Sequence, residues 1–501
     1  MESIEKKSGI IYLKSKFFFI RVVTYFSFLL LPIFLQKTVS MSMGFKLMLM
    51  VGYIFFMIGQ WFLLGKEIDH RLKIYFKVNS TIDRLVYRVF MGMFFTMLYF
   101  NILAFIFPSK WIYNIFWMTW VVLGLYYSWP TRGKIIQESA SSNVKEFFYL
   151  DSFERTLMGL TMLMFFVSIP ELPNINEFSN LKLFFDPLGR ITEFFWNFVL
   201  VNYYPFKNYP SLFKVAVSLH FYVVGIGLFL LTFYAFMRYF TSRRLSLLGV
   251  FALVSSWSLS KILSANFGDA IETTYSILWI WSFIWMTKSS SYRTGLFMGL
   301  VSFFGVVLNP HYYFFSIVSF PLAFYFLHKE KNRWYIRQTF KYMMLGLFLG
   351  SILFLISDKG FTTISLDQNY IKLVSHYLGR KAFFLLSFIG IVLLGLVAIS
   401  PKWMLEKNFN IDKFRLEQFG ILLGLIILFS LFSDSFLLYS FGLLWVLSFL
   451  SVIPIEYLFQ VITRLRSRRN MIYLLYIVAC LLDSHLEGRV KILYRIIKSN
   501  I

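Results

Sequence analysis

Long blocks of apolar residues, separated by shorter polar segments, run along most of the chain. The segments 17–36, 44–64, 215–237 and 382–399 are nearly free of charged residues. About 20 apolar residues in a helix are enough to cross the hydrocarbon core of a bilayer. Lipid offers no hydrogen-bond partner to the backbone, so such blocks must be helical. The pattern therefore predicts an all-α, polytopic integral membrane protein.

Applied along the whole chain, this length criterion predicts about fourteen transmembrane helices. They are expected at 17–36, 44–64, 86–107, 111–128, 156–170, 215–237, 245–260, 272–287, 295–309, 311–327, 342–357, 382–399, 417–432 and 436–456. The two helices on either side of Pro310 are predicted to be separate, because proline breaks a helix. A further apolar stretch, 471–483, is short and fits either another span or a helix in the membrane interface.

Composition and charge support a membrane protein and set its orientation. The chain is 58% hydrophobic and only 15% charged, whereas soluble domains carry about 25% charged residues. Its net charge of +24 is explained by Lys and Arg in alternate loops, as the positive-inside rule requires, so no nucleic-acid partner is needed. The rule predicts a cell (inner) membrane protein with a cytoplasmic N-terminus and with 171–214 and 358–381 outside. A single cysteine, Cys480, excludes an intrachain disulfide.

The spacing of polar segments divides the predicted chain into five parts. These are an N-terminal four-span module (1–128), a cytoplasmic linker (129–154), a core with the long outer loop 171–214 (155–357), C-terminal spans with the outer loop 358–381 (358–456) and a basic cytoplasmic or interfacial tail (457–501).

Acids, bases and histidines from four predicted outer loops fall on one side of the membrane. Carboxylates act as general bases, and Arg or Lys holds phosphate, so the outer face is the predicted site. The candidate catalytic residues are Asp186 and Glu193, and the candidate substrate-binding residues are Arg190, Lys261, Asp269, Glu272, His311, His376 and Arg380. Simpler interpretations remain open: Asp186 suits a helix N-cap, and acids at 269 and 272 suit a helix N-terminus. No spacing requires a metal, so the cofactor is undetermined, a divalent metal being one option.

Residues 156–330 resemble the GT-C superfamily of polyprenyl-phosphate-dependent membrane glycosyltransferases in layout. The shared elements are a span, a long outer loop with an acid (Asp186), a short basic inner turn (Arg243-Arg244), a span that begins Asp269-Ala270-Ile271-Glu272, and a Gly-rich span, Gly295 to Leu300, that ends in a proline turn. The chain departs from the family in having Asn309 before that proline, a single Asp in the loop, and four spans ahead of the matching region.

The resemblance implies sugar transfer from a polyprenyl-phosphate donor to a lipid, glycan or protein acceptor on the outer face, with membrane lipid as the surroundings. Asp186 would then act as the base, and Arg190, Lys261 or Arg380 would hold the donor phosphate. A transporter or lipid flippase is the alternative, since such proteins also use broken helices and polar residues within the membrane.

Overall fold

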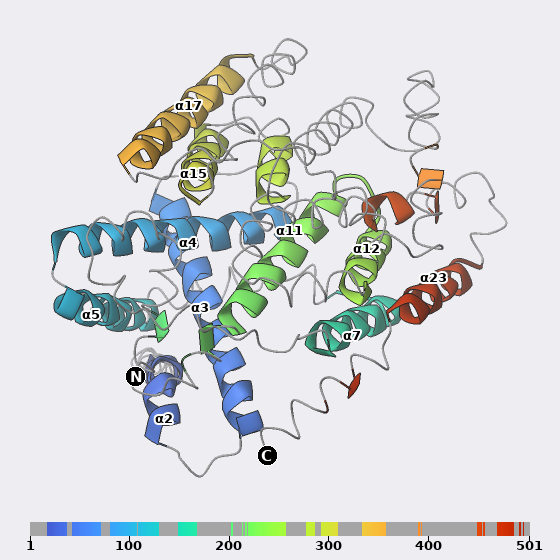
Figure 1. Cartoon of the computed structure of the whole chain (residues 1–501), viewed down its shortest axis with the longest axis horizontal. Coiled ribbons are helices and arrows are strands. Elements are labelled where there is room, and N and C mark those ends of the chain that lie inside the picture. The colour runs from blue at the N-terminus through green and yellow to red at the C-terminus, as the bar shows by residue number, and fades with distance from the viewer. Residues whose placement is uncertain are drawn as a thin grey trace, which may run out of the picture. The chain divides into compact units, whose positions relative to one another are not determined.

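A computed structural model (Figure 1) describes the chain in a series of segments. These are residues 18–37, 43–71, 81–107, 109–129, 149–167, 219–256, 277–285, 292–308, 333–356 and 468–484, with short pieces at 202–203, 213, 216–217, 389–390, 392, 448–452, 454–455, 490–491 and 494. Within these segments the secondary structure is helical and contains no strand. The predicted all-α fold is therefore confirmed for the described residues.

The chain divides into two compact units. The first contains residues 1–149 and 175–224, and the second contains 150–174 and 225–500. The helices of the first unit are α2 (Leu31–Lys37), α3 (Met43–Arg71), α4 (Thr81–Ile106) and α5 (Ser109–Ser128). Those of the second are α7 (Ser152–Val167), α11 (Gly227–Met237), α12 (Arg243–Ser255), α15 (Tyr292–Leu308), α17 (Arg333–Ile356) and α23 (Arg469–Asp483). The π-helix η4 (Phe221–Ile226) precedes α11.

Two described helices, α3 and α4, are long and apolar enough to cross a membrane by length and composition. Both extend into 65–85, the stretch between the predicted spans 44–64 and 86–107. The reason is an ion pair: the Nε and Nη2 atoms of Arg88 donate to Oδ2 of Asp69 at 3.0 and 2.9 Å. Because each charge is neutralised by the other, the two helices continue past the apolar blocks.

A glycine crossing holds α3 and α4 together. A Cβ atom on Gly92 would overlap the backbone of Trp61, and one on Gly65 would overlap the backbone of Arg88. Small residues at a crossing let two backbones approach closely, which is a common basis of helix association in membranes. The pair α15 and α17 repeats this arrangement in the second unit, with Gly299 against Gly346.

Other helix boundaries differ from the apolar pattern in ways that the sequence explains. The first predicted span, 17–36, is interrupted by a turn at Leu30. The helix α15 ends at Leu308, just before Asn309-Pro310, as expected from the proline. Its predicted partner, 311–327, lies outside the described residues, as do most of the predicted spans at 382–399, 417–432 and 436–456.

Candidate functional site

The start of α7 carries a reciprocal cap. The backbone N–H of Glu154 donates to Oδ1 of Asp151 at 2.8 Å, and the backbone N–H of Asp151 donates to Oε2 of Glu154 at 3.0 Å. Asp151 is therefore the N-cap and Glu154 stands three residues on, which is the spacing of a capping box. The two side chains satisfy N–H groups that a helix start otherwise leaves open, so the first turn of α7 is fixed.

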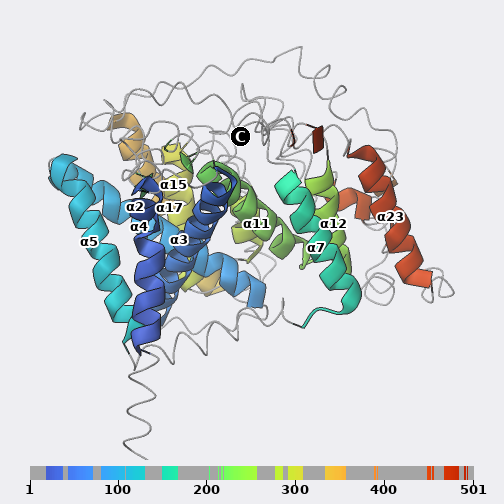
Figure 2. The same cartoon turned by 90° about the horizontal axis from the view of Figure 1, so that it is seen from below.

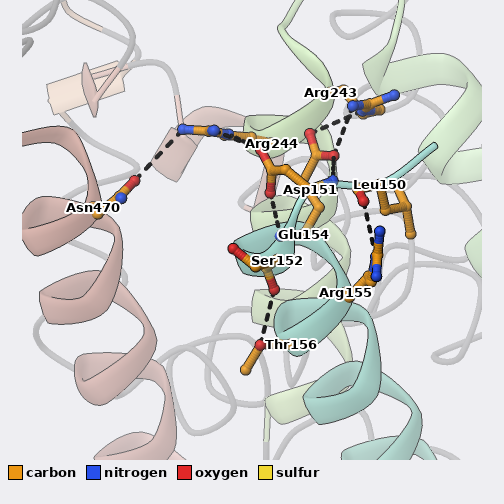
Figure 3. Close-up of polar contacts among 9 residues, drawn as sticks. All are labelled: Leu150, Asp151, Ser152, Glu154, Arg155, Thr156, Arg243, Arg244 and Asn470. Carbon is orange, nitrogen blue, oxygen red and sulfur yellow. Dashed lines mark hydrogen bonds and ion pairs between the residues drawn. The ribbon is translucent and has the colours of Figure 1, made fainter.

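The same two carboxylates bind the start of α12 (Figure 3). Arg243 holds Glu154 with both edges of its guanidinium, Nε to Oε1 at 2.8 Å and Nη2 to Oε2 at 2.7 Å. Arg244 donates from Nε and Nη2 to Oδ2 of Asp151 at 3.0 and 2.5 Å. Two-point Arg–carboxylate pairs fix direction as well as distance. We call these four residues the α7–α12 charge cluster.

The charge cluster helps to set how α7, α11 and α12 run. Because α7 and α12 both begin at the cluster and pack against each other, they run in the same direction. The helix α11 also packs on α12 and ends at Met237, a short turn before Arg243, so it runs the opposite way. The three helices therefore form an up, down, up arrangement, with 149–154 and 238–244 at one end and Val167 and Ser255 at the other.

The charges of the cluster attach α7 to α12, and they leave Asp151 and Glu154 poorly suited to proton transfer. Burial disfavours the charge on Asp151, but the N–H of Glu154 and the guanidinium of Arg244 outweigh it and lower the pKa of Asp151. Glu154 is buried, with 2% of its surface exposed, and both of its oxygens are held. A general base must be free to accept a proton from a substrate, whereas these two carboxylates are already bound.

A second polar group lies buried in the first unit. The hydroxyl of Tyr203 and Nδ1 of His220 share a hydrogen bond of 2.7 Å, and the indole of Trp61 meets the His220 ring edge-on, with centroids 6.1 Å apart. Tyr203, His220 and Trp61 are all at least 98% buried. His220 directly precedes η4, and π-helical turns often occur at functional sites. The contact explains how a polar ring is accommodated in an otherwise apolar segment.

The residues that the sequence pointed to as the site lie outside the described residues. This holds for Asp186, Glu193, Arg190, Lys261, Asp269, Glu272, His311, His376 and Arg380. Among the residues that are described, no group of three or more His, Cys, Asp or Glu side chains gathers as a metal site.

The charges of the predicted inner loops were expected to serve topology only, so the charge cluster was missed. Residues 151–154 read Asp-Ser-Phe-Glu, directly ahead of an apolar run. An N-cap residue followed three places later by Glu is the signature of a capping box, so the start of α7 could have been predicted from the sequence. The pairing with Arg243 and Arg244 was not, because a contact across 89 residues leaves no local pattern.

Comparison with known proteins adds no family: no family model, no curated protein and no solved structure matches the chain.

Proposed function

We propose that the chain is a polytopic membrane glycosyltransferase of the GT-C type. It would take a sugar from a polyprenyl-phosphate donor and transfer it to an acceptor hydroxyl on the outer face of the membrane. The N-terminus and the charge cluster would lie on the cytoplasmic side, where the positive-inside rule puts the basic turns.

The observation that carries the proposal is the common direction of α7 and α12. The segment with Asp186 follows α7, and the segment with Lys261, Asp269 and Glu272 follows α12. Since both helices start at the charge cluster, both segments leave the described helices at the opposite end. The order of these segments along the chain, with the basic turn Arg243-Arg244 between them, matches the layout that suggested the family.

The proposed reaction uses a carboxylate base at Asp186. The carboxylate removes the proton from the acceptor hydroxyl, and the acceptor oxygen forms a bond to the anomeric carbon of the sugar. The bond between that carbon and the phosphate oxygen breaks, and polyprenyl phosphate leaves with the electron pair. Arg190, Lys261 or Arg380 would stabilise the charge that develops on the phosphate.

The direct test is transfer by the purified full chain in proteoliposomes. The donors are a panel of polyprenyl-phosphate hexoses and pentoses with tritiated sugars, and the acceptors are a total lipid extract and a glycan pool. We expect one donor to be consumed, with label appearing in an acceptor. Asp186→Asn should lower the rate by about 10²–10⁴-fold, the usual cost of losing a general base, with unchanged thermal unfolding.

Two controls separate chemistry from folding. Glu193→Gln makes the same change of charge seven residues further along the chain and tests which acid is the base. Arg243→Met loosens the charge cluster, so it should lower stability without changing which donor is used. Full transfer by Asp186→Asn together with full transfer by Glu193→Gln would reject the catalytic assignment, and failure of every donor would reject the proposed activity.

A further inference from the structure

The helix α23 has two apolar faces, and only one of them is used for packing. Tyr473, Tyr476, Ile477 and Cys480 are buried, and the hydroxyl of Tyr476 shares a hydrogen bond of 2.7 Å with the hydroxyl of Ser451. The outward face is a stripe of large apolar side chains. It consists of Met471, Leu474, Leu475, Val478 and Leu482, which are between 43% and 80% exposed.

The start of α23 lies at the charge cluster. Arg244 donates from Nη1 to Oδ1 of Asn470 at 3.5 Å, and the rings of Phe153 and Tyr473 lie 5.5 Å apart. The first turn of α23 therefore touches the first turns of both α7 and α12. Figure 3 shows α7 and α23 leaving the cluster side by side, and Figures 1 and 2 both draw them along a common direction. It follows that α23 runs parallel to α7.

The charge and length of α23 fit a helix that enters a bilayer from the same side as α7. Arg468 and Arg469 are exposed at its start, at the level of Arg243 and Arg244. Its 15 residues span about 22 Å, so it reaches most of the way through a core about 30 Å thick. Arginines at the entry end match the phosphate level of the cytoplasmic leaflet.

We propose that α23 is a membrane-inserted helix, parallel to α7, whose outward stripe packs against lipid acyl chains. The parallel helix α7, which exposes the same kind of face, identifies lipid as the occupant. The outward side chains Met162, Leu163 and Phe166 of α7 are also exposed, by 47%, 55% and 41%. Both helices pack on α12, meet near their charged starts and run parallel, and the apolar outer face of each suits acyl chains. The proposal rests on insertion of α7 and goes beyond the proposed sugar transfer.

Depth measurements on spin labels distinguish insertion from a helix lying flat in the interface. In a Cys480→Ala background, a nitroxide is attached to Met471→Cys or to Val478→Cys in the full chain, reconstituted in phosphatidylethanolamine–phosphatidylglycerol vesicles. Collision with oxygen, which is concentrated in the bilayer, is compared with collision with a nickel chelate, which stays in water. The matched pair on α7 is Thr156→Cys and Leu163→Cys, with the same seven-residue spacing.

Insertion predicts that the label at 478 lies deeper than the label at 471 by about 10 Å, since seven helical residues rise about 10 Å. The α7 pair should show the same step in the same direction. Equal depth at 471 and 478 would overturn the proposal in favour of an in-plane helix. Dominant nickel collisions at both sites would show that water covers the stripe. Poor access to both reagents would show that protein covers it.

The α7 pair also separates this proposal from the proposed function. If both α7 labels lie in water, the inserted arrangement of this unit is wrong, whatever the transfer assay gives. If the α7 labels show the depth step and the α23 labels do not, only the insertion of α23 is rejected. Sugar transfer is measured separately and is not required for either result.

Discussion

The guanidinium of Arg243 binds both oxygens of the Glu154 carboxylate, with N–O distances of 2.8 and 2.7 Å, although the two residues are 89 positions apart in the sequence. The Glu154 side chain is 3% exposed and the Arg243 side chain is 31% exposed. Glu154 also caps α7, so one buried acid both starts a helix and attaches it to α12. This pair therefore helps to set the common direction of the two helices.

Removing the cation should cost far more here than at an exposed pair. Arg243→Met leaves the buried Glu154 carboxylate without a counter-charge, so we expect a loss of roughly 3 kcal/mol in unfolding free energy. The matched control is Arg71→Met, which removes the 3.2 Å pair with Glu67 on α3. The Arg71 side chain is 69% exposed, and such pairs contribute less than about 1 kcal/mol. Thermal unfolding in detergent measures both, and equal losses would contradict the assignment of Glu154 as a buried clamp.

Crowding at the α3–α4 crossing gives a second prediction. Gly92→Ala adds a Cβ that overlaps the backbone of Trp61, and the helices must separate, which costs on the order of 1–3 kcal/mol. Gly59→Ala, on α3, adds the same methyl group where nothing lies within 4 Å. It should be neutral or stabilising, because Ala favours a helix more than Gly does. A Gly92→Ala protein as stable as Gly59→Ala would show that the crossing is not this close.

Low pH should weaken the cap on α7. The pKa of Asp151 is lowered in the folded protein, so its ionised form stabilises the fold at pH values above the unfolded pKa. That contribution is lost as the pH falls below about 3.8 and through the lowered folded pKa. The side chain is 37% exposed, so solvent screens the pair and the effect stays below about 1 kcal/mol.

Asp151→Asn isolates this charge, because Asn caps a helix about as well as Asp. We expect the unfolding midpoint of the native chain to fall more steeply than that of Asp151→Asn between pH 4.5 and pH 3. Above pH 5 the native chain should be the more stable of the two. Parallel curves over this range would exclude a role for the Asp151 carboxylate.

Among the described residues, the sequence locates several helices but not how they pair. Apolar blocks located α3, α4, α5 and α7, because exclusion of charge is a local property. The ends of α3 and α4 were missed, since the Asp69–Arg88 pair neutralises charges that would otherwise end an apolar helix. The links from Asp151 and Glu154 to the Arg243-Arg244 turn were also missed. The turn was noticed for its basic charge, but nothing in the sequence specifies which acids it meets.

Membrane sidedness is the prediction on which the proposed outer-face site depends. The Lys and Arg bias predicts that 129–154 lies inside and 171–214 outside, and α7 comes between them in the chain. In a Cys480→Ala background, an impermeant maleimide added to intact cells should modify Ser179→Cys and spare Ser141→Cys. Permeabilised cells should label both, which controls for access to Ser141.

Labelling of Ser141→Cys but not Ser179→Cys in intact cells would invert α7 and α12 together, since both start at the charge cluster. It would then put the segment with Asp186 in the cytoplasm, where the proposed outer-face transfer cannot occur.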